Sequence, residues 1–157
     1  MRKSASFFVA VLFLVACLMV ACLTGCNSII TQDDTVKIEG MGEVWRPTKE
    51  EADMEGGRFL RIAMRKQFPE LGLSEDTMET VMYDSKLHPY KIRKNEKTGI
   101  DEAVWPLEVK IRMQAPAYNG RMFAATMDVT LHFYQNEVGR KLCDYYVTNV
   151  TRDGFVD

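Results

Sequence analysis

The sequence predicts an α+β protein: one main helix packed on a curved antiparallel β-sheet, after an N-terminal signal helix. Three patterns support this class: an uncharged apolar stretch at residues 7–23, a helical spacing of apolar residues at 49–68, and strict alternation of apolar and polar residues at 107–113. Apolar residues recur about every 3.6 positions on an amphipathic helix and at every second position on a half-buried strand. We expect residues 35–157 to form a single α+β domain, because a segment of this length suits one hydrophobic core.

The first 25 residues are expected to be a signal peptide. Arg2 and Lys3 provide a basic start, the apolar stretch 7–23 follows, and two small residues then precede Cys26. An ordinary secretory signal also has a basic start and an apolar stretch, but it prefers an A-x-A-like cleavage site. An apolar helix of about 18 or more residues could instead cross a membrane. The segment Leu23-Thr24-Gly25-Cys26 resembles the lipobox of bacterial lipoproteins, which favours a lipoprotein signal over both alternatives.

The lipobox resemblance implies cleavage between Gly25 and Cys26 and attachment of a diacylglyceryl thioether to Cys26. One acyl chain holds a protein to a membrane only marginally, whereas two or more anchor it stably. Asn27 follows the cysteine, and the sorting rule of Gram-negative lipoproteins implies the outer membrane when this residue is not aspartate. We therefore expect residues 26–34 to form a short lipidated tether. It would hold the domain in the bacterial envelope, at the outer membrane and facing the periplasm.

Charge and cysteine content restrict the function further. The signal peptide contains two of the 20 Lys and Arg residues and none of the 22 Asp and Glu residues, so the mature chain has a net charge of −4. No block of basic residues suggests a nucleic-acid partner. Cys143 would be the one free thiol of the mature chain, because Cys17 and Cys22 leave with the signal and Cys26 carries lipid. We expect Cys143 to be a small buried hydrophobic residue. A reactive thiol or an intermolecular disulfide is the alternative.

The N-terminal part of the domain is expected to hold one short strand and the main helix. Residues 35–45 alternate loosely and contain two glycines, which indicates an edge or bulged strand. Thr48 and Glu51 have the spacing of a capping box, so a helix is predicted at residues 49–68. The pair Gly56-Gly57 indicates a kink, a close packing point or a boundary between two short helices. The apolar stripe of this helix consists of Phe59, Leu60, Ala63, Met64 and Phe68.

The last third of the chain predicts three antiparallel strands, at residues 107–113, 121–134 and 140–150, followed by a tail at 151–157. The third strand is partly apolar on both faces, which indicates an inner strand. Residues 73–100 are compatible with a short helix that ends at Val81 or with a strand at 80–83. Short connections make the three consecutive strands neighbours, and the helix can then cover one face of the sheet.

Short phrases in the C-terminal half resemble small uncharacterised envelope lipoproteins with cystatin-like or NTF2-like rolls. These phrases are Val104-Trp105-Pro106-Leu107-Glu108-Val109, Leu131-His132-Phe133-Tyr134 and Val138-Gly139. The resemblance covers roughly residues 48–150 and implies a long helix against a curved antiparallel sheet. Such rolls host enzymes, ligand-binding modules and protein-docking modules, so the fold alone does not select a function.

The polar face of the second predicted strand is the candidate site for a ligand or partner. Asp128, Thr130, His132 and Tyr134 share this face. An acid near a histidine could act in general acid–base catalysis, but Asp128 and His132 are about 13 Å apart on an extended strand. Aromatic residues could also serve recognition or simply pack: Trp45, Trp105, Tyr118, Tyr134, Tyr145 and Tyr146.

No motif in the sequence identifies a reaction. It contains no P-loop, dinucleotide fingerprint or G-x-S-x-G motif, and no close spacing of metal ligands. We therefore expect no catalytic residues, metal or cofactor. The favoured hypothesis is a non-enzymatic envelope lipoprotein that binds an apolar ligand or an envelope protein partner. The alternatives are an NTF2-like enzyme with a polar sheet cavity and an accessory subunit of a secretion or transport assembly.

Overall fold

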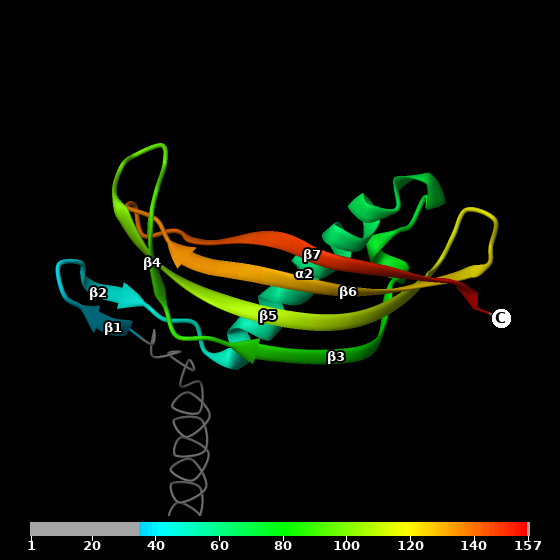
Figure 1. Cartoon of the computed structure of the whole chain (residues 1–157), viewed down its shortest axis with the longest axis horizontal. Coiled ribbons are helices and arrows are strands. Elements are labelled where there is room, and N and C mark those ends of the chain that lie inside the picture. The colour runs from blue at the N-terminus through cyan, green and yellow to red at the C-terminus, as the bar shows by residue number, and fades with distance from the viewer. Residues whose placement is uncertain (1–34, 157) are drawn as a thin grey trace, which may run out of the picture. The chain divides into compact units, whose positions relative to one another are not determined.

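The computed structural model describes residues 35–156, which are mainly β. Strands make up 55% of these residues and helices 20%. They form a five-stranded antiparallel sheet, a separate two-stranded sheet and one α-helix (Figure 1). The predicted α+β class, a cystatin-like or NTF2-like roll, is therefore wrong. The predicted signal peptide at 1–25 and lipidated tether at 26–34, with Gly25 and Cys26, lie outside the described residues.

The larger sheet has the strand order β3-β5-β6-β7, and β4 also pairs with β5. All of its pairings are antiparallel. The elements in chain order are β1 (Thr35–Ile38), β2 (Gly42–Trp45), α2 (Lys49–Gln67), two 3₁₀ turns (Pro69–Leu71 and Glu75–Thr77), β3 (Glu79–Leu87), β4 (Lys91–Lys94), β5 (Asp101–Pro116), β6 (Met122–Gln135) and β7 (Lys141–Val156).

Strands β3 and β4 follow one another along the same edge of β5. β3 pairs with residues 107–114 and β4 with residues 101–104. Between them the His88 amide still donates to the Pro106 carbonyl oxygen at 2.8 Å. Pro89 has no amide proton and interrupts the ladder. The sequence pattern alone did not establish strands β3 and β4. Both are largely exposed on both faces and therefore lack an alternation of apolar and polar residues.

The hydrophobic core lies between one face of the large sheet and one side of α2. Alternate residues of β5 and β6 point into it, as predicted, and all are at most 3% exposed: Leu107, Val109, Ile111, Met113, Phe123, Ala125, Met127, Val129, Leu131 and Phe133. From the helix, Leu60, Ala63 and Met64 are fully buried. The Phe68 ring meets the Phe123 ring edge-on, with 4.8 Å between the ring centres.

The capping box at the start of α2 is confirmed. The Glu51 amide donates to Thr48 Oγ1 at 3.1 Å, and the Thr48 amide donates to Glu51 Oε2 at 3.0 Å. The helix continues through both glycines to Gln67. A Cβ atom on Gly56 would lie 3.3 Å from Leu131 Cδ1 of β6, whereas one on Gly57 would meet nothing within 4 Å. Gly56 is therefore a close packing point, which was one of the three predicted alternatives.

The single predicted strand at 35–45 is in fact the β1–β2 hairpin. Gly40 and Gly42 have φ angles of 81° and 80°, a left-handed conformation that glycine adopts without a Cβ clash. Ile38 pairs with Gly42 and Thr35 with Trp45. The hairpin places Trp45 beside the large sheet, where its amide donates to Gln135 Oε1 of β6 at 3.4 Å.

The predicted inner position of the third strand is also wrong, because β7 is an edge strand that continues to Val156. One register shift within the predicted strand, together with the exposed residues Leu142 and Tyr146, explains why both faces looked apolar. Asn149 pairs with Asp128 but Val147 pairs with Val129, so Thr148 is an extra residue that reverses the alternation. Val147 and Val150 therefore both pack against the core.

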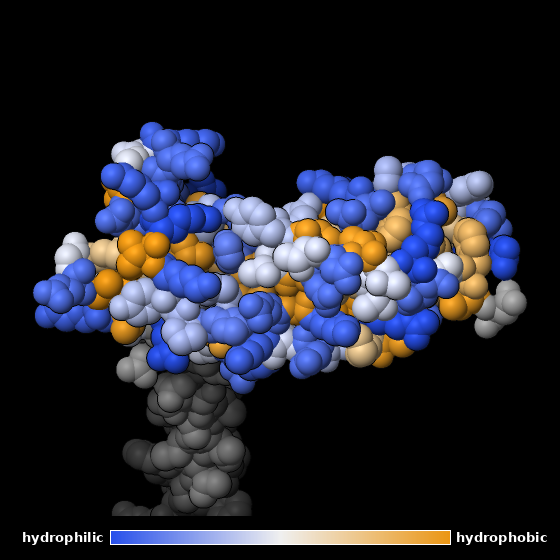
Figure 2. Space-filling model, viewed as in Figure 1, coloured by the Kyte–Doolittle hydropathy of each residue, from blue (hydrophilic) through white to orange (hydrophobic). Residues whose placement is uncertain are grey.

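The surface of the described residues is mixed in polarity. On the face shown in Figure 2, hydrophilic residues predominate and hydrophobic residues form patches between them. Five of the twelve exposed large hydrophobic residues belong to the β3–β4 edge, namely Val81, Met82, Tyr83, Tyr90 and Ile92. Within residues 35–156, no helix has both the length and the apolar character that a membrane span needs.

Candidate functional site

The four polar residues predicted to share a face do lie together on the face of β6 that points away from the core. Asp128, Thr130, His132 and Tyr134 alternate there with buried residues. Asp128 pairs with Lys110 and Asn149 on the neighbouring strands, whereas His132 pairs with Pro106 and Asp144. Within the described residues, no hydrogen bond or ion pair joins Asp128 to His132.

Asp128 and Thr130 line a shallow groove of about 460 Å³ on this outer face. The Asp128 carboxylate accepts a hydrogen bond from Asn149 Nδ2 at 3.2 Å. The charged residues around the groove are all exposed: Asp84, Lys86, Glu108 and Lys110. The enzyme hypothesis requires an enclosed cavity, because acid–base catalysis benefits from a site that excludes water. This groove is open to solvent and does not provide one.

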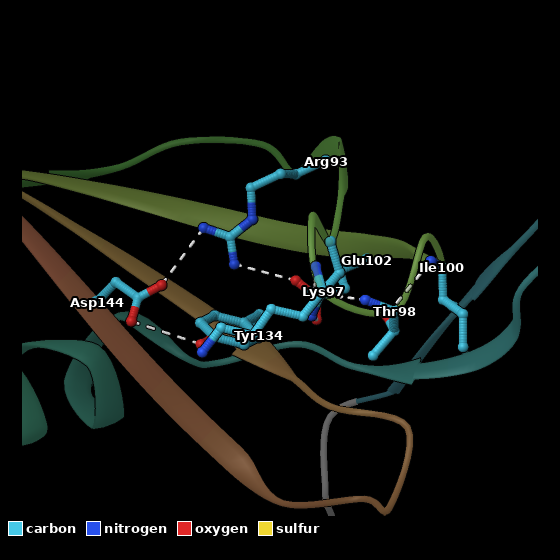
Figure 3. A network of polar contacts seen from close by, with 8 residues as sticks. Arg93, Lys97, Thr98, Ile100, Glu102, Tyr134 and Asp144 are labelled. Atoms are coloured by element: carbon cyan, nitrogen blue, oxygen red, sulfur yellow. Dashed lines mark hydrogen bonds and ion pairs between the residues drawn. The ribbon is translucent and has the colours of Figure 1, made fainter.

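Tyr134 belongs to a polar network further along the same face. The Arg93 guanidinium donates to Glu102 Oε2 at 3.0 Å and to Asp144 Oδ2 at 3.4 Å. It lies 4.6 Å from the centre of the Tyr134 ring, between the two carboxylates (Figure 3). Asn95 donates to the second Glu102 oxygen at 2.7 Å. Glu102 is 6% exposed, so its charge is buried but fully paired.

The pKa shifts in this network indicate a structural role for it rather than a catalytic one. Burial opposes the charge of Arg93, but the hydrogen bond and charge of Glu102 outweigh burial and raise the pKa of Arg93. Burial and the positive charge of Arg93 lower the pKa of His132, although Asp144 opposes this. His132 is therefore held neutral, with its Nδ1 buried and without a hydrogen-bond partner among the described residues. Its ring packs instead against Tyr146, with 5.0 Å between the ring centres.

A second polar cluster connects the start of α2 to β3. Asp53 Oδ1 accepts from the Tyr83 hydroxyl at 2.7 Å and from the Ser85 hydroxyl at 2.8 Å, while Lys49 Nζ donates to Asp53 Oδ2 at 2.6 Å and to Ser85 Oγ at 2.7 Å. Burial alone would raise the pKa of Asp53, but these hydrogen bonds lower it overall. A weakly basic carboxylate does not activate a serine. We therefore interpret the cluster as a structural contact that orients Tyr83 and Ser85.

An apolar groove lies between α2, the end of β2, the end of β6 and the start of β7. Its volume is about 610 Å³, which is within the usual range of small-molecule sites. Its walls are mainly apolar and consist of Trp45, Ala52, Phe59, Phe133, Leu142 and Cys143. Met54 also lines the groove and is 72% exposed. Charges of both signs surround it: Glu51, Glu55, Arg58 and Lys141.

Trp45 and Cys143 contribute polar atoms to the apolar walls of the groove. Trp45 is 7% exposed, and its Nε1 is buried without a hydrogen-bond partner among the described residues. Lys141 Nζ lies 4.9 Å from the centre of the Trp45 ring. The Cys143 thiol donates to the Asp144 carbonyl oxygen at 3.5 Å. Burial, together with the charges of Asp144 and Glu55, raises the pKa of Cys143 to about 12, so this thiol is a poor nucleophile.

The described residues contain no group of three or more His, Cys, Asp or Glu side chains that could bind a metal ion. No protein-family model matches the chain. Searches of curated proteins and of solved structures also return no significant match. The comparisons therefore indicate neither a family nor a fold relative.

Sequence reasoning identified Trp45 as an aromatic candidate but did not predict the apolar groove. The walls come from four elements, β2, α2, β6 and β7, which only tertiary packing brings together. It also missed the pair formed by Arg93 and Glu102. A usable signal was present, because Glu102 directly precedes the apolar run Ala103-Val104-Trp105-Pro106-Leu107. A charged residue at the start of such a run is a candidate for a buried, paired carboxylate.

Proposed function

We propose that this chain is a lipid-anchored protein of the bacterial envelope whose domain binds an apolar ligand, or an apolar segment of a partner protein, without catalysing a reaction. The lipobox-like segment that ends at Cys26 supports the anchor. Asn27 supports a position at the outer membrane, with the domain in the periplasm. The observation that carries the binding role is the groove lined by Trp45, Phe59 and Phe133.

The groove favours an apolar occupant for a simple energetic reason. Burial of apolar surface contributes about 25 cal/mol per Å². Met54 is 72% exposed and Phe59 is half-buried, so an occupant would remove apolar surface of the protein from water as well as its own. The surrounding charges, Glu55 and Arg58 among them, are of both signs and impose no net charge on the occupant.

The anchor is tested by intact mass spectrometry of the full-length chain after extraction from membranes. Loss of residues 1–25 together with an added acyl mass on Cys26 is the expected result. A Cys26→Ser chain should carry no acyl mass. An uncleaved wild-type chain without acyl groups would refute the anchor and leave the groove unaffected.

The groove is tested with a fatty acid whose chain carries bromine atoms, because bromine quenches tryptophan fluorescence on contact. The extracted chain is titrated in lipid nanodiscs, and quenching of Trp45 is expected. Trp45→Phe should remove most of the quenching. Met54→Glu should weaken binding by about tenfold, because it replaces an apolar contact with a charge. Tyr118→Glu is the matched control, since Tyr118 is 78% exposed and lies outside the groove. Equal binding by all variants would exclude this groove as the site.

A further inference from the structure

We propose that β3 is a self-association edge, through which two copies of this chain pair antiparallel about a two-fold axis at Ser85. The pairing would join the two large sheets into one continuous sheet. This inference is independent of the apolar groove, because none of the residues that it uses lines that groove.

The main chain of β3 presents unused hydrogen-bonding groups at the free edge. The His88 amide donates to Pro106 of β5. In an antiparallel ladder every second residue points its N–H and C=O toward the same neighbour. Lys86 and Asp84 therefore point toward β5, and Leu87, Ser85 and Tyr83 point away from it. Among the described residues, no hydrogen bond outside the β3–β5 ladder uses the main chain of these three residues. Figure 1 shows β3 at the margin of the sheet, with β5 on its other side.

A two-fold axis at Ser85 matches these groups with one another. Ser85 meets Ser85 of the second copy, and Tyr83 meets Leu87 of the second copy. All of these residues point their main-chain groups outward, so each pairing can form hydrogen bonds in both directions. Their side chains are on the core side of the sheet, because Ser85 pairs with Val109 and Tyr83 with Ile111 within one chain. The Asp53 cluster already orients the Tyr83 and Ser85 side chains.

The charges on the opposite face are self-complementary in this register. Asp84 meets Lys86 of the second copy, and the two-fold axis repeats the contact. Within each chain Asp84 pairs with Lys110, and Lys86 pairs with Glu108. A row across the joined sheet would contain Lys110 and Asp84 of one copy, followed by Lys86 and Glu108 of the other. Neighbouring residues in this row have opposite charges. Opposite charges directly across a strand pair stabilise a sheet, whereas like charges destabilise it. A register centred on Asp84 would instead place Asp84 against itself, and one centred on Lys86 would do the same for Lys86.

The ends of β3 limit the pairing to a closed dimer. The register shift between Thr80 and Met82 marks a bulge at one end, and Pro89 interrupts the edge at the other. β7, at the other edge of the sheet, carries two register shifts. Bulges and prolines are the usual protection of a sheet edge against open-ended association. The regular stretch at residues 82–87 is used up by one neighbour, because an isologous contact about a two-fold axis closes on itself. Met82, Tyr83 and Val81 supply the exposed apolar side chains at this edge.

The test is sedimentation equilibrium of the full-length chain, extracted from membranes in a density-matched detergent. Wild type should show a reversible monomer–dimer equilibrium. Asp84→Lys and Lys86→Asp should each weaken the dimer by about tenfold or more, because two symmetry-related contacts become repulsive. The double variant Asp84→Lys with Lys86→Asp should restore association, since the opposite charges meet again. Lys110→Asp is the matched control; it makes the same charge change one strand further in and should leave the dimer intact.

The double variant separates the proposal from simple misfolding. Within one chain it places a lysine at position 84 beside Lys110 and an aspartate at position 86 beside Glu108, so it should be no more stable than the single variants. Restored dimerisation can therefore come only from contacts between chains. A wild-type chain that stays monomeric at about 100 μM, well above typical interface affinities, would overturn the proposal. So would a dimer that the single charge reversals leave unchanged, or one that the double variant does not restore.

Discussion

Arg93 and Glu102 form an ion pair of unequal burial: their closest nitrogen–oxygen distance is 3.0 Å, the Glu102 side chain is 8% exposed and the Arg93 side chain is 33% exposed. The carboxylate has therefore lost most of its water and depends on Arg93 and Asn95 for compensation. A buried charge that loses its partner is costly, whereas an exposed pair contributes little.

Arg93→Met should lower the free energy of unfolding by about 2–3 kcal/mol, less than a fully buried pair would, because water screens the exposed part of the arginine. Urea denaturation of the extracted chain measures it. Adding Glu102→Gln should recover part of the loss by removing the orphaned charge. Arg112→Met, which breaks the more exposed pair with Asp153, is the control and should cost less than about 1 kcal/mol. Equal losses at both sites would show that burial of Glu102 carries no special cost.

The two neighbouring glycines of α2 should respond oppositely to substitution. Gly57→Ala should stabilise the protein by about 0.5–1 kcal/mol, because alanine is the better helix former and its Cβ would meet nothing. Gly56→Leu should destabilise it by about 2 kcal/mol or more, because the side chain would push into Leu131 and Leu107. Thermal unfolding of both variants provides the comparison. A stabilised Gly56→Leu chain would contradict the close contact between α2 and β6.

Protonation of His132 should lower the free energy of unfolding in mild acid. Its folded pKa is lowered from 6.5 by burial and by nearby positive charge, so the unfolded chain binds the proton more readily. The stability from neutral His132 is then fully present above pH 6.5 and is lost as the pH falls from 6.5 through the folded pKa. A His132→Gln chain should lose less stability between neutral and mildly acidic pH than wild type. Unfolding free energies across this range measure the difference, and superimposable pH profiles would refute it.

Cys143 should react slowly in the folded protein. Its thiol has a pKa raised to about 12, so little thiolate is present at pH 8. Alkylation by iodoacetamide, followed by mass spectrometry, should be at least about a hundredfold slower than in the urea-unfolded chain. Cys143→Ser identifies the signal. Similar rates in both states would instead support the reactive thiol that the sequence left open.

The strongest local patterns predicted their elements well. Strict alternation located the inward faces of β5 and β6, because a strand that is half-buried leaves a period of two in its sequence. The capping box of Thr48 and Glu51 located the start of α2 for a similarly local reason. β3 and β4 left no such trace, because both of their faces are largely exposed and their pairing depends on the long edge that β5 offers. The fold class failed for this reason, since the strands without a pattern were not counted.

The sequence by itself determined the apolar stripe of α2, the shared outer face of Asp128, Thr130, His132 and Tyr134, and the lipobox-like segment at Cys26 that motivates the proposed anchor. These are properties of spacing along the chain, and spacing is preserved on folding. Only the tertiary structure decided that Trp45 and Phe133 line one groove, that Arg93 neutralises Glu102, and that β3 lies at an edge of the sheet. Each of these depends on residues far apart in the chain, and their meeting follows from how the strands pair rather than from any local pattern.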